Sequence, residues 1–200
     1  MRKIKVVLLL TMLLLFNSLP AIAEGCDLLQ NSTPDELVSY LNGIAADDGN
    51  AGCITFAIGE LGKHRYEPAI TVLVRFLDFR RPLDSREKQG LYLHIQGIAE
   101  IYPAANALEE IGKSALPAVL DTIKTESTSE KARENAVSVW MEIYRSEAPK
   151  GIAVLRQEAD LNKGVVVKRN LEWSLSKAVT WCNPPDKAQC KAAAKIGDAK

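Results

Sequence analysis

The chain has 200 residues, and its 25 lysines and arginines balance 25 aspartates and glutamates, so the formal net charge is zero. Hydrophobic residues make up 47% and aromatic residues 6%. This composition is typical of a globular domain and excludes disordered, collagen-like and multi-span membrane chains. The length allows one domain, or at most two small ones, with enough chain to bury a core. A zero balance argues against a nucleic-acid binder that works through bulk positive charge.

The first 23 residues have the layout of a secretory signal peptide. Arg2, Lys3 and Lys5 form a basic start, residues 6–16 are apolar but for one threonine, and small residues lead to Ala23. The apolar run is shorter than the ~20 residues that a spanning helix needs. We therefore expect cleavage after Ala23, no membrane span in the mature chain, and a periplasmic or secreted protein. Removing the three basic residues leaves 22 basic and 25 acidic ones, a net charge of −3.

Four cysteines remain in the mature chain: Cys26, Cys53, Cys182 and Cys190. An even number of cysteines in an oxidising compartment indicates two disulfides. Of the three pairings that four cysteines allow, we expect Cys26 with Cys53 and Cys182 with Cys190, one near each end of the chain. A zinc site is disfavoured because the chain has no Cys-x-x-Cys pair and only two histidines. The sequence therefore predicts neither a metal nor a cofactor.

A seven-residue pattern occurs twice and returns a third time in altered form. Residues 57–63 read Ala-Ile-Gly-Glu-Leu-Gly-Lys, and residues 107–113 read Ala-Leu-Glu-Glu-Ile-Gly-Lys. A Pro-Ala-aliphatic sequence follows each of them. The third copy spans residues 136–145 and has Tyr144 where the other two have glycine. Internal similarity of this kind predicts a repeat architecture.

Each copy carries apolar residues at i, i+3, i+4 and i+7, the spacing of one helix face. These residues are Ile54, Ala57, Ile58 and Leu61 in the first copy, Ala104, Ala107, Leu108 and Ile111 in the second, and Ala136, Val139, Trp140 and Ile143 in the third. Gly62 and Gly112 are predicted to end their helices in a left-handed conformation, with a proline in the first turn of the next helix. Each copy is therefore predicted to be a helical hairpin that must stack on its neighbours to bury its apolar face.

Capping helices are expected at both ends of the array. Residues 33–36 (Thr-Pro-Asp-Glu) form a capping box with proline at the first helical position, and Leu37, Leu41 and Ile44 form the apolar face that follows. A last helix is expected to begin near Val165. Alternation of the β type is nowhere long enough to indicate a sheet, so the predicted fold class is all-α.

The second copy, followed by Leu-Pro-Ala-Val-Leu at residues 116–120, resembles HEAT repeats of the short bacterial kind also found in phycobilisome lyases. The resemblance covers residues 50–160. It implies an α-solenoid of about three to four HEAT-like helical hairpins with terminal capping helices, whose concave surface is used for protein–protein contact. The predicted organisation is a signal peptide (1–23), a HEAT-like repeat domain (24–183) and a C-terminal tail or short helix (184–200).

Candidate partner contacts lie in the turn of the first copy and in an insertion that follows it. The first two copies are fifty residues apart, from Gly62 to Gly112, whereas the second and third are 32 apart, from Gly112 to Tyr144. Insertions in repeat arrays often map to a binding face. The candidate contacts are His64, Arg65, Tyr66, Arg80, Arg81, Tyr92 and His94. The alternative is a longer loop whose acidic and basic side chains offset one another in solvent.

These features predict an exported, non-catalytic HEAT-repeat scaffold that binds an unidentified protein or peptide. The alternative is an enzyme accessory or lyase-like factor that handles a tetrapyrrole or another small ligand, which only the resemblance suggests. Nucleic acid is not expected as a partner, because the sequence has no basic stripe. No catalytic residues are assigned, since the sequence contains neither a Gly-x-Ser-x-Gly elbow nor a glycine-rich phosphate loop.

Overall fold

The computed structural model describes residues 26–44, 51–90, 97–183 and 185–195. Every regular element in these ranges is helical, which confirms the predicted all-α class. The α-helices are α2 (Pro34–Gly43), α3 (Ala51–Lys63), α4 (Ile70–Leu73), α5 (Ser85–Lys88), α6 (Ile98–Ile101), α7 (Pro103–Ile111), α8 (Leu116–Lys124), α9 (Glu130–Ile143), α10 (Ala148–Leu161), α11 (Val165–Trp181) and α12 (Lys187–Lys195). The short 3₁₀-helices are η1 (Asp27–Leu29), η2 (Glu67–Ala69), η3 (Val74–Phe76), η4 (Gly112–Ala115) and η5 (Arg145–Glu147).

Some predictions fall on parts of the chain outside the described residues. These parts include the expected signal peptide, and also Tyr92 and His94 in the insertion. Among the helices that are described, none combines the length and the apolar character needed to cross a membrane.

Helix α2 begins at the predicted capping box. The Glu36 backbone N–H donates to the Thr33 hydroxyl oxygen at 3.4 Å, and the Thr33 backbone N–H donates to the Glu36 carboxylate at 2.7 Å. This backbone bond from Thr33 lowers the pKa of Glu36 below its usual value. Leu37 and Leu41 on the predicted face of the helix are buried.

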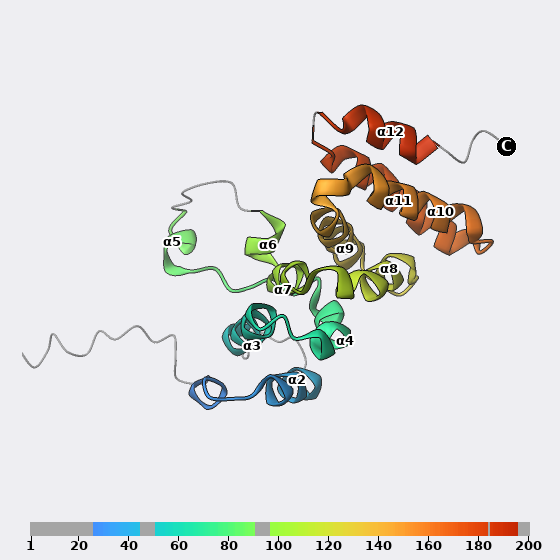
Figure 1. Ribbon diagram of the computed structural model, residues 1–200. Coiled ribbons are helices and arrows are strands. Elements are labelled where there is room, and N and C mark those ends of the chain that lie inside the picture. The colour runs from blue at the N-terminus through green and yellow to red at the C-terminus, as the bar shows by residue number, and fades with distance from the viewer. Residues whose placement is uncertain (1–25, 45–50, 91–96, 184, 196–200) are drawn as a thin grey trace, which may run out of the picture.

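The helices follow one another in chain order from α2 to α12, with α5 and α6 to one side (Figure 1). Helix α3 packs against α7, α7 against α9, and α9 against α11. Helix α8 packs against α9 and α11, and α10 packs against α11 and α12. By contrast, α9 and α10 of the third copy contact each other only lightly. The extensive contacts therefore join one copy to the next.

The three predicted apolar faces form the core of these contacts. All of their residues are buried except Ile111 and Ile143, which are half-buried and pack against the core. Helix α11 begins at Val165, as predicted, and adds Leu171 and Leu175 to the same core. The helical periodicity in the sequence therefore identified the core correctly.

The two repeat glycines have different roles. Gly112 has a φ of 82° after α7, as predicted for a residue that ends a helix with positive φ. The same prediction for Gly62 is wrong, because Gly62 lies inside α3 and the residue with positive φ after this helix is Arg65, at 49°. Position 62 requires a glycine for another reason, because a side chain there would collide with Ala107 of α7.

The third copy carries an aromatic pair at the position of the repeat glycine. The ring of Tyr144 packs against that of Trp140, with centroids 5.1 Å apart. The Trp140 indole N–H donates to the carbonyl oxygen of Gly151 at 3.0 Å. A Cβ atom at Gly151 would lie 2.8 Å from the Tyr144 ring. The departure from the pattern at Tyr144 is thus accommodated by a glycine in the first turns of α10.

Both expected cysteine pairs lie at disulfide distance. Cys26 and Cys53 have Cα atoms 5.3 Å apart and join the N-terminal segment to α3. Cys182 and Cys190 have Cα atoms 6.6 Å apart and join the end of α11 to α12. The segment predicted as a C-terminal tail or short helix therefore contains a helix, α12, that packs on α10 and α11.

Candidate functional site

A cavity of about 560 Å³ lies where α6, α7, α9 and the connection between α11 and α12 meet, and we call it the Glu109 cavity. Its volume is within the range of ligand-binding sites, ~300–1,000 Å³. The insertion contributes residues 97–99, α7 contributes Glu109, and the chain beside the C-terminal cysteine pair contributes Trp181 and Asn183. The fold thus brings together segments that are far apart in the sequence.

One face of α9 and its extension forms another wall of the Glu109 cavity. Ser138, Met141, Glu142 and Arg145 line it at the spacing i, i+3, i+4 and i+7. This face lies beside the one that buries Trp140. The apolar periodicity of α9 predicts only the buried face, and the second face was not predicted, although its spacing is visible in the sequence.

Glu109 has an unusual electrostatic environment in the Glu109 cavity. Burial of its carboxyl raises the pKa to about 7, an effect that Glu110 reinforces and Arg145 opposes. Arg145 forms its ion pair with Glu142 instead. Among the described residues, none makes a hydrogen bond or an ion pair with the Glu109 carboxyl. The group therefore titrates near neutral pH and keeps hydrogen-bonding capacity beside the cavity.

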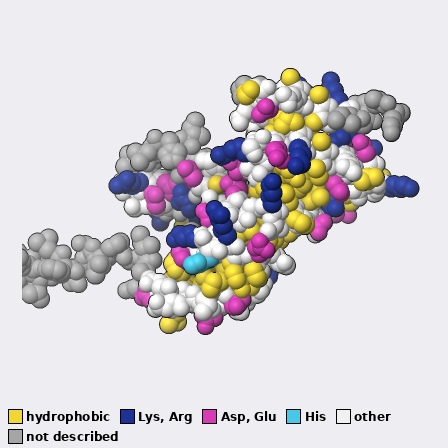
Figure 2. Space-filling view, viewed as in Figure 1, with side chains coloured by type: hydrophobic (Ala, Val, Ile, Leu, Met, Phe, Trp, Pro, Cys, Tyr) yellow, Lys and Arg dark blue, Asp and Glu magenta, His cyan; other side chains and the backbone are white. Residues whose placement is uncertain are grey.

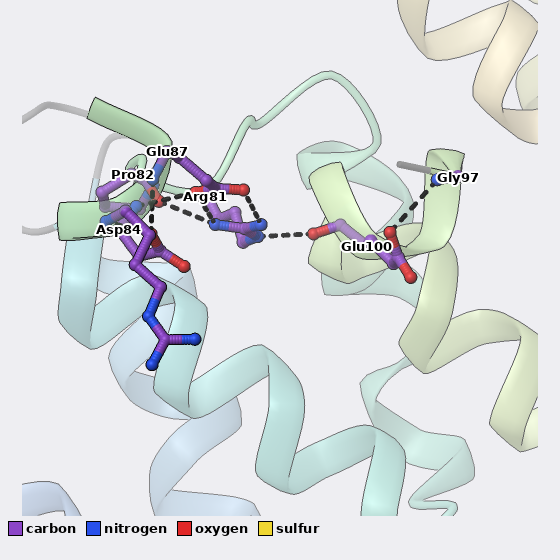
Figure 3. A network of polar contacts seen from close by, with 7 residues as sticks. Arg81, Pro82, Asp84, Glu87, Gly97 and Glu100 are labelled. Carbon is purple, nitrogen blue, oxygen red and sulfur yellow. Dashed lines mark hydrogen bonds and ion pairs between the residues drawn. The ribbon is translucent and has the colours of Figure 1, made fainter. Parts of the chain in front are cut away.

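Arg81 in the insertion bonds both to Glu87 and to the backbone of α6 (Figure 3), and α6 carries lining residues of the Glu109 cavity. The Arg81 guanidinium donates to the two carboxylate oxygens of Glu87 at 2.6 and 2.8 Å, and this bonding raises the pKa of Arg81. Its Nε donates to the Glu100 carbonyl oxygen at 2.5 Å, and the Arg81 backbone N–H donates to the Ile101 carbonyl oxygen at 3.1 Å. The Glu100 carboxylate accepts a bond from Gly97, a lining residue, at 3.3 Å. Arg81 therefore positions the wall that the insertion provides.

The candidate contacts in the turn of the first copy do not line this cavity. His64 is exposed and lies 4.0 Å from Glu60. Arg65 is exposed and has the positive φ that ends the α3 turn. The Tyr66 hydroxyl donates to Asp35 of α2, which raises the pKa of Tyr66. Tyr66 thus joins the first copy to the capping helix.

The two arginines predicted as contacts are placed differently. Arg80 is exposed, whereas the Arg81 side chain is engaged inside the insertion by Glu87 and by backbone carbonyls. Whether the predicted set binds a partner stays a prediction. Glu109 lies within a repeat motif, at the position that Gly59 has in the first copy, and is not among the contacts predicted from the sequence.

A second hollow of about 520 Å³ lies between α4 and α8, and its lining is rich in hydroxyl groups. Three of these hydroxyl groups donate hydrogen bonds within the protein. Ser129 donates to Asp78 at 2.7 Å, and Thr122 and Thr125 donate to backbone carbonyls of α8 at 2.9 and 2.8 Å. In the described part of the chain, no group of three or more His, Cys, Asp or Glu side chains is placed to hold a metal ion. The Glu109 cavity is the stronger candidate site.

The surface around these hollows carries charges of both signs. Lysine and arginine side chains alternate with acidic ones over the face seen in Figure 2, and hydrophobic side chains gather over α3 and α4 and again over α9 and its neighbours. Comparisons with protein-family models, with curated proteins and with solved structures found no match for this chain.

Proposed function

We propose that this protein is an exported, non-catalytic helical-repeat scaffold that binds a protein or peptide segment at the Glu109 cavity. The observation that carries the proposal is the convergence of α6, α7, α9 and the α11–α12 connection around a carboxyl that no described residue pairs with. Repeat scaffolds bind their partners on extended surfaces to which several successive repeats contribute. Glu109 in the second copy and Met141 in the third occupy matching positions in the pattern, and both line the cavity.

The proposed architecture is an α-solenoid of HEAT type. Its support is the stacking of equivalent helices from successive copies, α3 on α7 and α7 on α9, together with the resemblance of the second copy to HEAT repeats. Stacking of this kind buries faces that a single hairpin leaves exposed.

The proposed location is the periplasm or the extracellular medium. Two cysteine pairs at disulfide distance support it, because disulfides persist in oxidising compartments and are rare in the cytosol. The layout of residues 1–23 as a signal peptide points the same way.

Site-specific photo-crosslinking tests the proposed binding role. A photoreactive amino acid replaces Ser138, which lines the Glu109 cavity, and in a control variant it replaces Leu161, which is 66% exposed at the end of α10. Irradiation of native envelopes is expected to give a defined protein adduct from position 138 that is absent from position 161. Equal adduct patterns at the two positions contradict the proposal.

The volume of the Glu109 cavity also supports a second candidate, a factor that handles a small ligand. Native mass spectrometry and visible absorption of protein purified from its source distinguish the two. A stoichiometric bound molecule or a chromophore band, with no protein adduct at position 138, favours the small-ligand function.

A further inference from the structure

We propose that the Glu109 cavity binds a primary ammonium group, a lysine side chain of the partner, with the Glu109 carboxylate as counter-ion and Trp181 as apolar wall. This inference rests on the proposed function and names the chemistry that the cavity recognises.

The charged side chains that line the Glu109 cavity favour the binding of one cation. Its described lining includes three charged side chains, Glu109, Glu142 and Arg145. Arg145 and Glu142 form an ion pair with each other. The ionised form of Glu109 is then compensated only in part, by the charge of Arg145, and a half-buried carboxylate without a bonded partner is unfavourable. A bound cation removes this penalty, whereas an anion meets two carboxylates.

The groups that act on Glu109 come from its own helix and from the α9 side. Glu110 of α7 raises the pKa of Glu109, and Arg145 beyond α9 lowers it. Glu142 is the other acid of the lining. The segments from α6 and from the end of α11 and its connection to α12 contribute uncharged residues, among them Ile98 and Trp181. The balance of charges on the cavity lining therefore favours a positively charged ligand.

The uncharged lining suits a lysine side chain. Ile98, Met141 and Ala148 provide apolar surface for a chain of methylene groups. The indole of Trp181 is an aromatic surface of the kind that attracts an ammonium group. Ser138 and Asn183 add hydrogen-bonding groups to the same cavity. Carboxylate, indole and apolar surface together match a lysine better than a neutral or acidic side chain.

The test uses the full mature chain and three probes at millimolar concentration. They are the Nα-acetyl methylamides of lysine, norleucine and arginine, and norleucine has the methylene chain without the ammonium group. Carbon-13 NMR of the glutamate carboxyls follows binding and titration, and the Glu109→Gln variant identifies the Glu109 signal. The matched control is Glu110→Gln, the same change at the next residue of α7, which does not line the cavity.

The lysine probe is expected to lower the pKa of Glu109 and to bind about tenfold more tightly at pH 8 than at pH 6. The reason is that the ionised fraction rises from about 0.1 to about 0.9 across a pKa of about 7. The norleucine probe is expected to bind more weakly and without this pH dependence. Glu109→Gln is expected to abolish the advantage of lysine over norleucine, and Glu110→Gln to keep it.

Three results overturn the inference: equal binding of lysine and norleucine probes, tighter binding at pH 6 than at pH 8, and tighter binding of the arginine probe. The second result indicates a neutral ligand that binds protonated Glu109. These failures are separable from failure of the scaffold function. If position 138 still crosslinks to a protein, only the inference about the ammonium group is contradicted. If the lysine probe binds but no protein adduct forms, the proposed protein-binding function is contradicted instead.

Discussion

Gly62 of α3 lies against Ala107 of α7 so closely that a Cβ atom on Gly62 would be 2.8 Å from the Ala107 Cα. Helices from successive copies therefore meet through their backbones at this point. A side chain cannot be accommodated by a rotamer change, because the atom in the way belongs to the main chain. The contact lies at the most extensive helix–helix interface of the described chain.

Gly62→Ala is expected to lower the free energy of unfolding by up to about 2 kcal/mol, because overpacking of a tight contact costs ~1–3 kcal/mol and outweighs the ~1 kcal/mol gained in helix propensity. Gly59→Ala is the matched control, since Gly59 lies in the same helix and has open space around its Cβ position. That variant is expected to raise the free energy of unfolding by about 0.5–1 kcal/mol. Urea denaturation followed by circular dichroism measures both, and a shift of the same sign in the two variants contradicts the close contact.

The cores of the repeats were predictable from the sequence because each helix buries one face with a period that local spacing reveals. The role of Gly62 was not, since glycine serves both positive φ and close helix contact, and only the neighbouring helix decides between them. The Glu109 cavity was not predictable either, because Glu109, the residues of α6 and Trp181 meet only through tertiary packing. The sequence signals that do exist are the second face of α9 and a glutamate at a position where the first copy has Gly59.

The two cysteine pairs are expected to contribute unequally to stability. They close loops with sequence separations of 27 and 8 residues, and loop-closure entropy predicts about 3.6 and 2.6 kcal/mol respectively. The double variant Cys26→Ser/Cys53→Ser is therefore expected to lose about 1 kcal/mol more than Cys182→Ser/Cys190→Ser. Denaturant unfolding measures the difference, and mass spectrometry after alkylation is expected to show no free thiol in the oxidised protein. A larger loss from the C-terminal pair contradicts the entropic argument.

Two adjacent arginines give a matched test of the insertion. Arg81→Gln removes the guanidinium that bonds to both carboxylate oxygens of Glu87, a residue only 6% exposed, and is expected to cost about 3 kcal/mol. Arg80→Gln changes an exposed side chain and is expected to stay within about 0.5 kcal/mol. Hydrogen exchange of α6 is expected to quicken in the Arg81 variant only, because Arg81 bonds to the Glu100 and Ile101 carbonyls. Equal exchange of α6 in both variants contradicts the positioning role.

The titration of Glu109 links stability to pH. Its pKa in the folded protein is about 7, above the ordinary value of 4.5. Between these values the folded state binds more protons than the unfolded state, so this group lowers stability as the pH rises from 4.5 to 7, and its effect is complete above that range.

Glu109→Gln removes this penalty while keeping the size of the side chain. The variant is therefore expected to gain stability relative to the wild type as the pH rises through this window, by about 2 kcal/mol after allowance for partial solvent exposure. Glu110→Gln, on the exposed side of the same helix, removes a charge that raises the pKa of Glu109, so it is expected to keep most of the wild-type loss of stability, with the window ending at a lower pH. Urea unfolding at pH 5 and pH 8 gives the comparison. If the free energies of unfolding of the wild type and Glu109→Gln change in parallel between these two pH values, the Glu109 carboxyl is solvated. The argument for an unpaired acid in the cavity then fails.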